Sequence, residues 1–211
     1  MKENMFNPWL DIPLADYEGH MKSAEVQQSV ALSELFAEAI AFCHPASLAV
    51  LGVAGGNGLE RIDSKKTARV VGVDINPLYL DAVRSRYSHI TGLELYCIDL
   101  AEQHIELNSV QLVHAALIFE HAGVGCCLDN AVSLVADGGA LSIVLQLPGK
   151  TGQDIGRSGV ASIQKLTCHF SMIDPVKLQE ILGERTFRLA YETRRSLPAG
   201  KEFWLGIFIR E

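Results

Sequence analysis

Glycine and aspartate residues gather where apolar segments of this chain end. Four glycines lie at or just after the end of the apolar segment 48–53: Gly52, Gly55, Gly56 and Gly58. Glycine lets a ligand approach the backbone closely, and the amides at the start of a following helix favour polar or anionic groups. The cluster therefore predicts a ligand-binding turn, with a simple tight connection between strand and helix as the alternative.

Asp74 and Asp99 end the next two apolar segments, 69–73 and 93–98. Asp74 follows Gly52 by 22 residues, which is about the spacing at which a carboxylate accepts hydrogen bonds from both hydroxyls of an adenosine ribose. The Asp99 carboxylate could reach the amino group of an adenine. Each aspartate could instead only cap the helix that follows it.

The glycine spacing differs from the GxGxxG pattern of dinucleotide-binding enzymes. Counting from Gly52, Ala54 stands at plus two and Asn57 at plus five, and counting from Gly56, Arg61 stands at plus five. The pattern disfavours a nicotinamide-dependent oxidoreductase. That function stays an alternative because the strand, the glycine turn and Asp74 are all present.

The elements that would position these residues follow from hydrophobic periodicity, which alternates between strand-like and helix-like along the chain. We expect a first amphipathic helix from near Ser23 to Cys43, ended by Pro45. Further helices are expected at 77–87, 124–134 and 175–182, and strands at 48–53, 69–73, 93–98, 110–115, 140–147, 187–195 and 203–210. The segment 137–139 is expected to end the helix before the fifth strand.

This order predicts an α/β fold with a doubly wound, seven-stranded sheet: five parallel strands and a C-terminal antiparallel hairpin. Ligands of such sheets bind outside the carboxyl ends of the strands. We expect a single domain over residues 1–211, with the segment 148–173 as a loop that carries a short helix and contributes to a substrate pocket.

Composition excludes several classes of function. The longest apolar stretches, such as 48–54 and 115–119, are far shorter than the roughly 20 residues that span a bilayer. The chain has 25 acidic and 18 basic residues and a net charge of −7, which disfavours nucleic acid as a partner. Its five cysteines form no CxxC pair and its seven histidines are dispersed, so we expect no metal site, reduced thiols and a cytoplasmic location without a secretion signal.

The order of the motifs resembles that of class I S-adenosylmethionine-dependent methyltransferases, of the bacterial type that acts on small molecules. VLGVAGGNGLERI resembles the first motif of this family, VVGVDINPLYLDAV the second and LYCIDL the third. VQLVHAALIFEH is similar to the segment after the fourth strand, and LVADGGALSIVLQLP to the approach to the fifth. The resemblance covers residues 48–147, and the flanks match in outline.

The resemblance implies where S-adenosylmethionine would bind. Its ribose would lie on Asp74, its adenine between Ile75 and Asp99 with Leu100, and its reacting centre near Ala115. Its methionine part would lie on the turn residues Gly52, Val53, Ala54, Gly55 and Gly56. In two positions the chain departs from the family. Gly52 replaces the usual acidic residue, which leaves the binding of the methionine amino group unassigned, and Ala54 replaces the first glycine, where we expect an ordinary negative φ.

The resemblance also implies a lid formed by residues 1–44, since a segment before the first strand commonly covers the cofactor in this family. In this segment Tyr17, Glu18 and His20 are candidates for acting on the methyl acceptor, with His20 as a general base or, alternatively, a packing histidine. Glu120 and His121, after the fourth strand, are further catalytic candidates that could instead anchor a turn. Gln146 could hydrogen-bond the substrate.

Methyl transfer from a sulfonium is an in-line displacement with a good leaving group, so the protein mainly positions the acceptor. Methylases of base amino groups typically have Asn or Asp, Pro-Pro and an aromatic residue after the fourth strand, whereas this chain has His-Ala-Ala-Leu at 114–117. No Pro-Cys dipeptide like that of cytosine C5 enzymes occurs. We therefore expect a small-molecule acceptor. A non-catalytic S-adenosylmethionine-binding module is the main alternative, and an NAD-dependent oxidoreductase the less favoured one.

Overall fold

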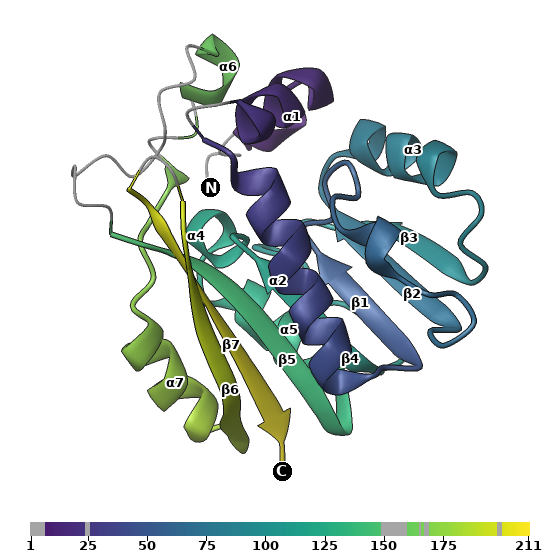
Figure 1. Cartoon of the computed structure of the whole chain (residues 1–211), viewed down its shortest axis with the longest axis vertical. Coiled ribbons are helices and arrows are strands. Elements are labelled where there is room, and N and C mark those ends of the chain that lie inside the picture. The colour runs from purple at the N-terminus through teal and green to yellow at the C-terminus, as the bar shows by residue number, and fades with distance from the viewer. Residues whose placement is uncertain (1–6, 24–25, 149–159, 165, 167–168, 198–199) are drawn as a thin grey trace, which may run out of the picture.

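A mixed seven-stranded sheet forms the centre of the protein. The computed structural model describes residues 7–23, 26–148, 160–164, 166, 169–197 and 200–211 (Figure 1). The sheet order is β3-β2-β1-β4-β5-β7-β6, and β7 runs antiparallel to both of its neighbours. The strands are β1 (Ser47–Leu51), β2 (Arg69–Asp74), β3 (Leu93–Cys97), β4 (Val110–Ala116), β5 (Val135–Leu147), β6 (Phe187–Ser196) and β7 (Glu202–Arg210). The predicted doubly wound sheet with a C-terminal antiparallel hairpin is confirmed.

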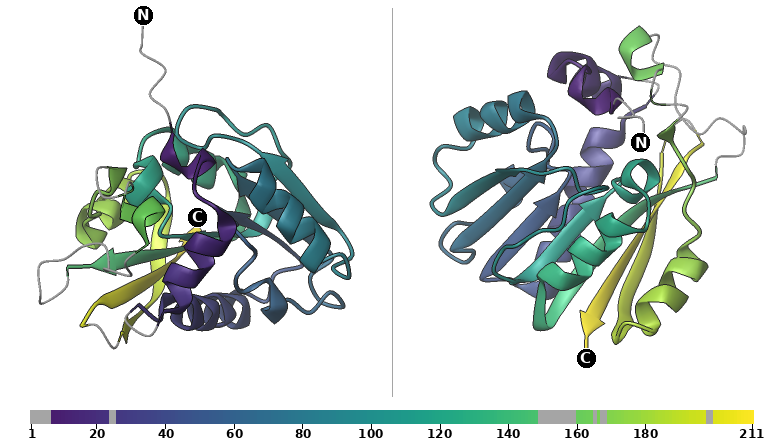
Figure 2. Two further views of the ribbon diagram at one scale, coloured as in Figure 1. Left: turned by 90° about the horizontal axis from the view of Figure 1, so that it is seen from above. Right: turned by 180° about the vertical axis from the view of Figure 1, so that it is seen from behind.

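Helices cover both faces of this sheet (Figures 1 and 2). On one face pack α2 (Gln28–Cys43) and α3 (Pro77–Arg86), and on the other α5 (Cys126–Leu134) and α7 (Pro175–Gly183). Four short segments lie beyond the carboxyl ends of the parallel strands: η1 (Pro8–Leu10), α1 (Leu14–Lys22), α4 (Phe119–Ala122) and α6 (Ala161–Gln164). A single 3₁₀ turn, η2 (Leu59–Arg61), follows the glycine cluster.

Alternate residues of the parallel strands enter two different cores. In β1, Leu48 and Val50 pack on the side of α2 and α3, whereas Ala49 and Leu51 pack on the side of α5. A parallel strand that is covered on both faces must be apolar at nearly every position. This is why the central strands stand out in the sequence as continuous apolar runs.

The N-terminal helix prediction was wrong in its start. The expected helix from near Ser23 to Cys43 corresponds to α2, which begins only at Gln28, and a separate helix, α1, precedes it at Leu14–Lys22. Ser23 leaves the helical region with a ψ of 149°, and Gln27 adopts a left-handed conformation with a φ of 45°. The candidates Tyr17, Glu18 and His20 lie within α1.

Two further boundaries differ from the prediction. The glycine cluster does not open an α-helix, because only the short η2 turn follows it. The segment 137–139 does not end a helix but lies inside β5, which begins at Val135 directly after α5. The pairing of β4 with β5 shifts register between Val110 and Leu112, and a Cβ on Gly139 would come within 3.0 Å of the Gln111 carbonyl oxygen. Glycine is needed there for close strand approach, not for a helix cap.

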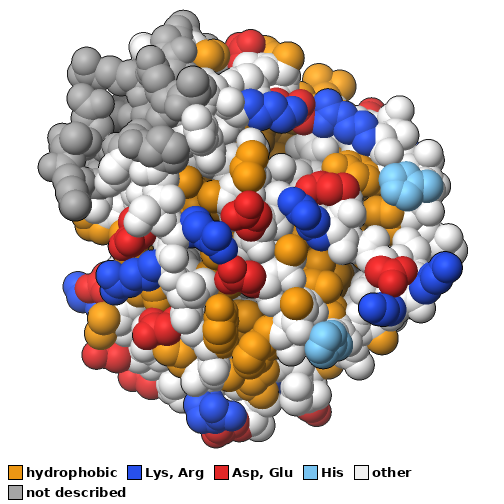
Figure 3. All heavy atoms as spheres, in the orientation of Figure 1, with side chains coloured by type: hydrophobic (Ala, Val, Ile, Leu, Met, Phe, Trp, Pro, Cys, Tyr) orange, Lys and Arg blue, Asp and Glu red, His pale blue; other side chains and the backbone are white. Residues whose placement is uncertain are grey.

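Acidic and basic side chains are interspersed on the face shown in Figure 3. Within the described residues, no helix has the length and apolar character required to cross a membrane.

The antiparallel strand β7 allows a direct test of the packing. A Cβ on Gly206 would lie 2.2 Å from Cη2 of the buried Trp204. We expect Gly206→Ala to lower the free energy of unfolding by about 1–3 kcal/mol, because the indole must move within a close-packed core. Chemical denaturation measures this. The matched control is Gly183→Ala at the end of α7, where an added Cβ meets nothing within 4 Å. Equal stability of both variants would contradict the packing of Trp204 over Gly206.

Candidate functional site

The turn after β1 has an unusual backbone. Gly52, Ala54, Gly56 and Gly58 all have positive φ, with values of 70°, 45°, 86° and 94°. The expectation of a negative φ at Ala54 was wrong. The left-handed conformation costs an alanine roughly 1–2 kcal/mol, and here the Ala54 amide donates a hydrogen bond of 2.8 Å to Asp74 Oδ2. A tertiary hydrogen bond therefore holds alanine in the conformation that glycine adopts at the neighbouring positions.

Asp74 connects the turns after β1 and β2. Its Oδ2 accepts from the Ala54 amide, and its Oδ1 accepts from the Asn76 amide at 2.9 Å. The side chain is buried, and this burial raises the pKa of the carboxyl group while the backbone hydrogen bonds oppose the rise. Each oxygen retains further acceptor capacity, and Asp74 lines a cavity. The carboxylate is therefore presented to a ligand in that cavity.

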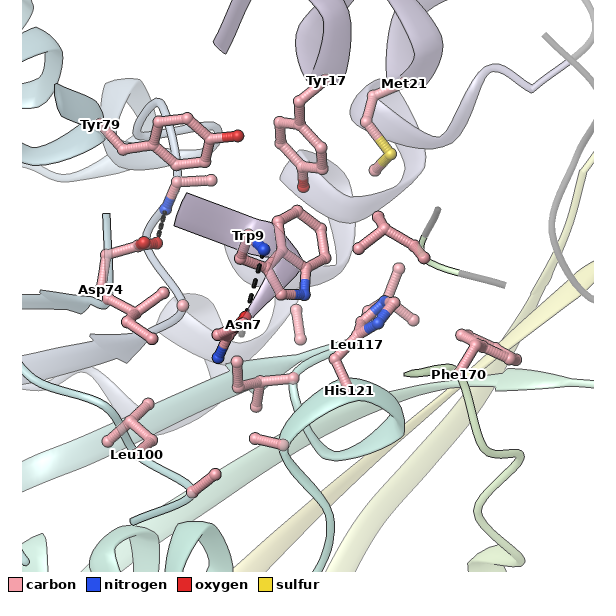
Figure 4. A pocket seen from close by; sticks show the side chains of 18 of the residues that line it. Asn7, Trp9, Tyr17, Met21, Asp74, Tyr79, Leu100, Leu117, His121 and Phe170 are labelled. Atoms are coloured by element: carbon pink, nitrogen blue, oxygen red, sulfur yellow. Dashed lines mark hydrogen bonds between the residues drawn. The ribbon is translucent and has the colours of Figure 1, made fainter. Parts of the chain in front are cut away.

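The cavity has a volume of about 150 Å³ and extends along the carboxyl ends of the parallel strands (Figure 4). The residues of the first three strand ends that line it are Gly52, Ala54, Asp74, Ile75, Ile98, Asp99, Leu100 and Ala101. At and after the end of β4 it is lined by Ala116, Leu117, Ile118, His121 and Ala122. The predicted ligand-binding edge of the sheet therefore coincides with a real hollow.

The segment from η1 to α1 closes this cavity on its outer side. Asn76 Nδ2 donates to the Trp9 carbonyl oxygen at 2.9 Å, and the Tyr79 hydroxyl donates to the Ile12 carbonyl oxygen at 2.8 Å. Both donors belong to the β2–α3 region that also carries Asp74. The covering segment is thus attached directly to the region where the ribose is expected.

Aromatic rings form the middle of the cavity. Trp9 meets Tyr17 and His121 edge-on, with ring centroids 5.7 and 4.9 Å apart, and His121 meets Phe170 at 5.4 Å (Figure 4). Burial, together with the charge of His169, lowers the pKa of His121 to about 4. The His121 imidazole is therefore neutral near pH 7.

Four further polar side chains line the cavity from α1, α2, the end of β5 and the residue before β7: His20, Gln28, Gln146 and Lys201. Lys201 Nζ donates to Gln146 Oε1 at 3.2 Å. Burial and the charge of Lys201 lower the pKa of His20. Burial raises the pKa of Tyr17, with smaller contributions from Asp74 and Glu18. At neutral pH the cavity therefore presents a neutral imidazole at His20 and a protonated phenol at Tyr17.

Glu120 lies behind the cavity wall. Its Oε1 accepts from the Gln146 amide at 2.8 Å, and no hydrogen bond reaches its Oε2 from the described residues. Burial raises the pKa of Glu120 to about 7. The Ser171 amide also donates to the Glu120 carbonyl oxygen, at 2.8 Å. Glu120 thus joins α4 to the end of β5 and to the segment after it. These contacts agree with the alternative in which Glu120 anchors a turn.

The structure brings most of the predicted site residues together. Tyr17, His20, His121 and Gln146 line the cavity, as do the cofactor candidates Gly52, Ala54, Asp74, Ile75, Asp99 and Leu100. The other predicted residues, Glu18, Val53, Gly55, Gly56, Ala115 and Glu120, are not in this lining. Ala115 is fully buried in the core on the α5 side, and its neighbour Ala116 lines the cavity instead.

Sequence reasoning missed several lining residues. Tyr79 lies on the helix directly after Asp74, so its place in the second motif could have indicated it. Trp9, Phe170 and Lys201 reach the cavity only through the fold, and no local pattern marks them. Within the described part of the chain, no group of three or more His, Cys, Asp or Glu side chains is placed to hold a metal ion. Part of the expected substrate loop, 149–159, lies outside the described residues.

The sheet order, the glycine turn and Asp74 together define the fold of class I S-adenosylmethionine-dependent methyltransferases. No protein-family model and no curated protein sequence matches the chain. Among solved structures, the N-methyltransferase NodS from Bradyrhizobium japonicum WM9 in complex with S-adenosyl-L-homocysteine matches with a TM-score of 0.69 and 13% identity, covering 97% of this chain and 99% of that chain.

Two further solved structures show how widely this fold is used. Magnesium protoporphyrin IX methyltransferase (ChlM) from Synechocystis PCC 6803 with bound S-adenosylhomocysteine matches with a TM-score of 0.66 and 12% identity, covering 93% of each chain. The [4+2]-cyclase SpnF also matches with a TM-score of 0.66 and 12% identity, over 88% of this chain and 82% of that chain. At these identities the likeness establishes the fold, and the reaction has to be argued from the site.

The buried carboxyl group of Glu120 predicts a pH dependence of stability. Its pKa is about 7 in the folded protein against 4.5 as a reference, so the folded state holds this proton over a range where the unfolded state has lost it. Stability from this group therefore falls as pH rises from about 4.5 to about 7. We expect Glu120→Gln to gain stability over the wild type across this range, by on the order of 3 kcal/mol at its upper end.

Urea denaturation of both proteins between pH 5 and pH 8 measures this difference. The control is Glu102→Gln, at an exposed position, for which we expect little change. A constant difference between Glu120→Gln and the wild type over the whole range would show that Glu120 does not hold an extra proton in the folded state.

Proposed function

We propose that this protein transfers the methyl group of S-adenosylmethionine to a small-molecule acceptor. The observation that carries this proposal is the placement of the buried Asp74 carboxylate at the cavity edge, tied to the positive-φ turn at Ala54. A carboxylate there suits a ribose diol, because two acceptor oxygens match two hydroxyl donors. The fold matches of the preceding section support it.

The described residues fit this cofactor along the whole strand edge. Asp74 would accept from the ribose hydroxyls, Ile75 and Leu100 would contact the adenine ring, and Asp99 would accept from its amino group. The backbone at Gly52 and Ala54 would lie along the methionine part. When bound, S-adenosylmethionine supplies an electrophilic methyl group on a good leaving group, so the protein does not need a covalent nucleophile.

The acceptor would occupy the part of the cavity that the aromatic side chains and the polar group of His20, Gln28, Gln146 and Lys201 line. His20, which burial keeps neutral, is the better candidate for receiving a proton from the acceptor. Tyr17, whose raised pKa keeps it protonated, would donate a hydrogen bond. Glu120 would act as a positioning residue, because it holds the Gln146 backbone and does not line the cavity. Catalysis would then be mainly by positioning.

We further propose that the chain forms a single domain, with residues 1–44 as lid and first helix and residues 148–173 as the substrate loop. Within the described residues, α1 and α6 are joined by a 2.7 Å hydrogen bond from Ser162 Oγ to Asp16 Oδ2. Both proposed covering segments therefore meet over the cavity. A site covered by both segments would suit an acceptor of small size.

A binding module without turnover is the second candidate, supported by Gly52 at the usual acidic position. Incubation with S-adenosylmethionine labelled in its methyl group and with cell extract separates the two. A labelled small product supports the enzyme, and binding without any labelled product supports the module. The sheet order disfavours the NAD-dependent alternative, because the inserted β7 differs from the 3-2-1-4-5-6 order of dinucleotide-binding sheets.

Titration with S-adenosylhomocysteine by calorimetry tests the cofactor site. We expect Asp74→Ala to weaken binding by at least about ten-fold, because hydrogen bonds to a charged group are lost. Asp137→Ala is the control, since the Asp137 side chain is fully exposed on β5, and it should bind as the wild type does. Unchanged affinity of a folded Asp74→Ala protein would overturn the proposed cofactor site, and so would a wild type that binds NADH but not S-adenosylhomocysteine.

A further inference from the structure

A second cavity lies on the other side of the glycine turn. It has a volume of about 240 Å³ and shares Tyr17, Met21, Gly52, Ala54 and Ala116 with the first cavity. The two hollows therefore adjoin at the turn on which the methionine part of the cofactor would lie. A ligand whose ribose is held by Asp74 could extend from the first cavity into the second.

The charged side chains of this second cavity balance one another. Among the described lining residues, Glu18 and Glu60 are acidic, and Lys22 and Arg86 are basic. Figure 3 shows acidic and basic side chains meeting in the region between α1, α2 and α3. A site with both signs of charge and no net charge suits a zwitterion better than a simple cation or anion.

Glu18 and Arg86 form an ion pair over the turn itself. Arg86 Nη1 also donates to the Gly55 carbonyl oxygen at 3.1 Å, and Lys22 Nζ lies 3.6 Å from Glu18 Oε2. A Cβ on Gly55 would collide with both Glu18 Oε1 and Arg86 Nη1. The ends of the Glu18 and Arg86 side chains therefore lie directly against the backbone of the turn at position 55.

Glu60 is already engaged on its own side of the cavity. Its Oε1 accepts from Ser33 Oγ at 2.7 Å, and its Oε2 accepts from the Gly58 amide at 2.9 Å. Glu18 and Arg86 are part-exposed, with side-chain exposures of 23% and 45%. Ion pairs at such positions are worth little by themselves, so a ligand can rearrange this one at small cost.

We propose that Glu18 and Arg86 bind the amino acid end of the cofactor. The Glu18 carboxylate accepts hydrogen bonds from the ammonium group, and the Arg86 guanidinium donates to the carboxylate group. This inference rests on the proposed function. Glu18 of α1 and Arg86 of α3 would thereby bind the methionine end of the cofactor. The family's usual acidic residue cannot do so here, because Gly52 replaces it.

A pair of ligands tests this assignment. S-adenosylhomocysteine carries the zwitterion, and 5′-methylthioadenosine has the same nucleoside and sulfur without it. We expect Arg86→Met and Glu18→Gln to weaken binding of S-adenosylhomocysteine by about ten-fold or more, and to change binding of 5′-methylthioadenosine by less than about two-fold. Arg86→Lys should recover part of the lost affinity, because it keeps the charge. Calorimetric titration gives all of these values.

Arg84→Met is the matched control, since Arg84 lies on the same helix and pairs with Asp81 at its exposed surface. It should leave both affinities unchanged. Equal weakening of the two ligands by Arg86→Met and Glu18→Gln would mean that the pair only holds the lid, and would overturn the assignment, as would no weakening of either. A wild type that binds neither ligand would instead refute the cofactor proposal on which this inference rests.

Discussion

The site depends on one buried carboxylate that accepts hydrogen bonds from two backbone amides. Asp74 ties the turn after β1 to the turn after β2 through its bonds to Ala54 and Asn76. Burial disfavours the charged form, and the hydrogen bonds from the backbone oppose that effect. The same side chain therefore shapes the edge of the sheet and provides the acceptor oxygens for a ligand.

Asn76 extends this connection to the covering segment. Its Oδ1 caps α3 by accepting from the Leu78 amide, its own amide donates to Asp74, and its Nδ2 donates to Trp9. A change at the carboxylate is thus two hydrogen bonds away from the lid. The covering segment at Trp9 and the glycine turn at Ala54 are therefore joined through Asn76 and Asp74.

Desolvation sets the chemistry that the cavity can offer. The imidazoles of His20 and His121 are kept neutral by burial, and the phenol of Tyr17 is kept protonated. The carboxylates of the lining lie at the strand ends of β2 and β3, whereas Lys201 directly precedes β7, which β1, β4 and β5 separate from β2 in the sheet. The two neutral imidazoles can accept a proton, and the phenol can donate a hydrogen bond. None of these three groups adds a negative charge to the cavity.

Much of the fold and part of the site were predictable from local signals, and the errors have identifiable causes. The parallel strands were predicted well because burial on both faces demands continuous apolar runs. The start of α2 was missed because a left-handed Gln27 breaks a pattern that still looks periodic. The negative φ expected at Ala54 follows the local preference of alanine, which a hydrogen bond from a residue 20 positions away overrides.

The sequence by itself determined the strands, their order of appearance and the aspartates at their ends, because these depend on residues that are close along the chain. Only the tertiary structure decided that Trp9, Phe170 and Lys201 share one cavity, and that Glu18 meets Arg86 over Gly55. The reason is that such contacts form when distant segments close over the sheet. Their partners are chosen by packing and chain direction, which leave no periodic signal in the sequence.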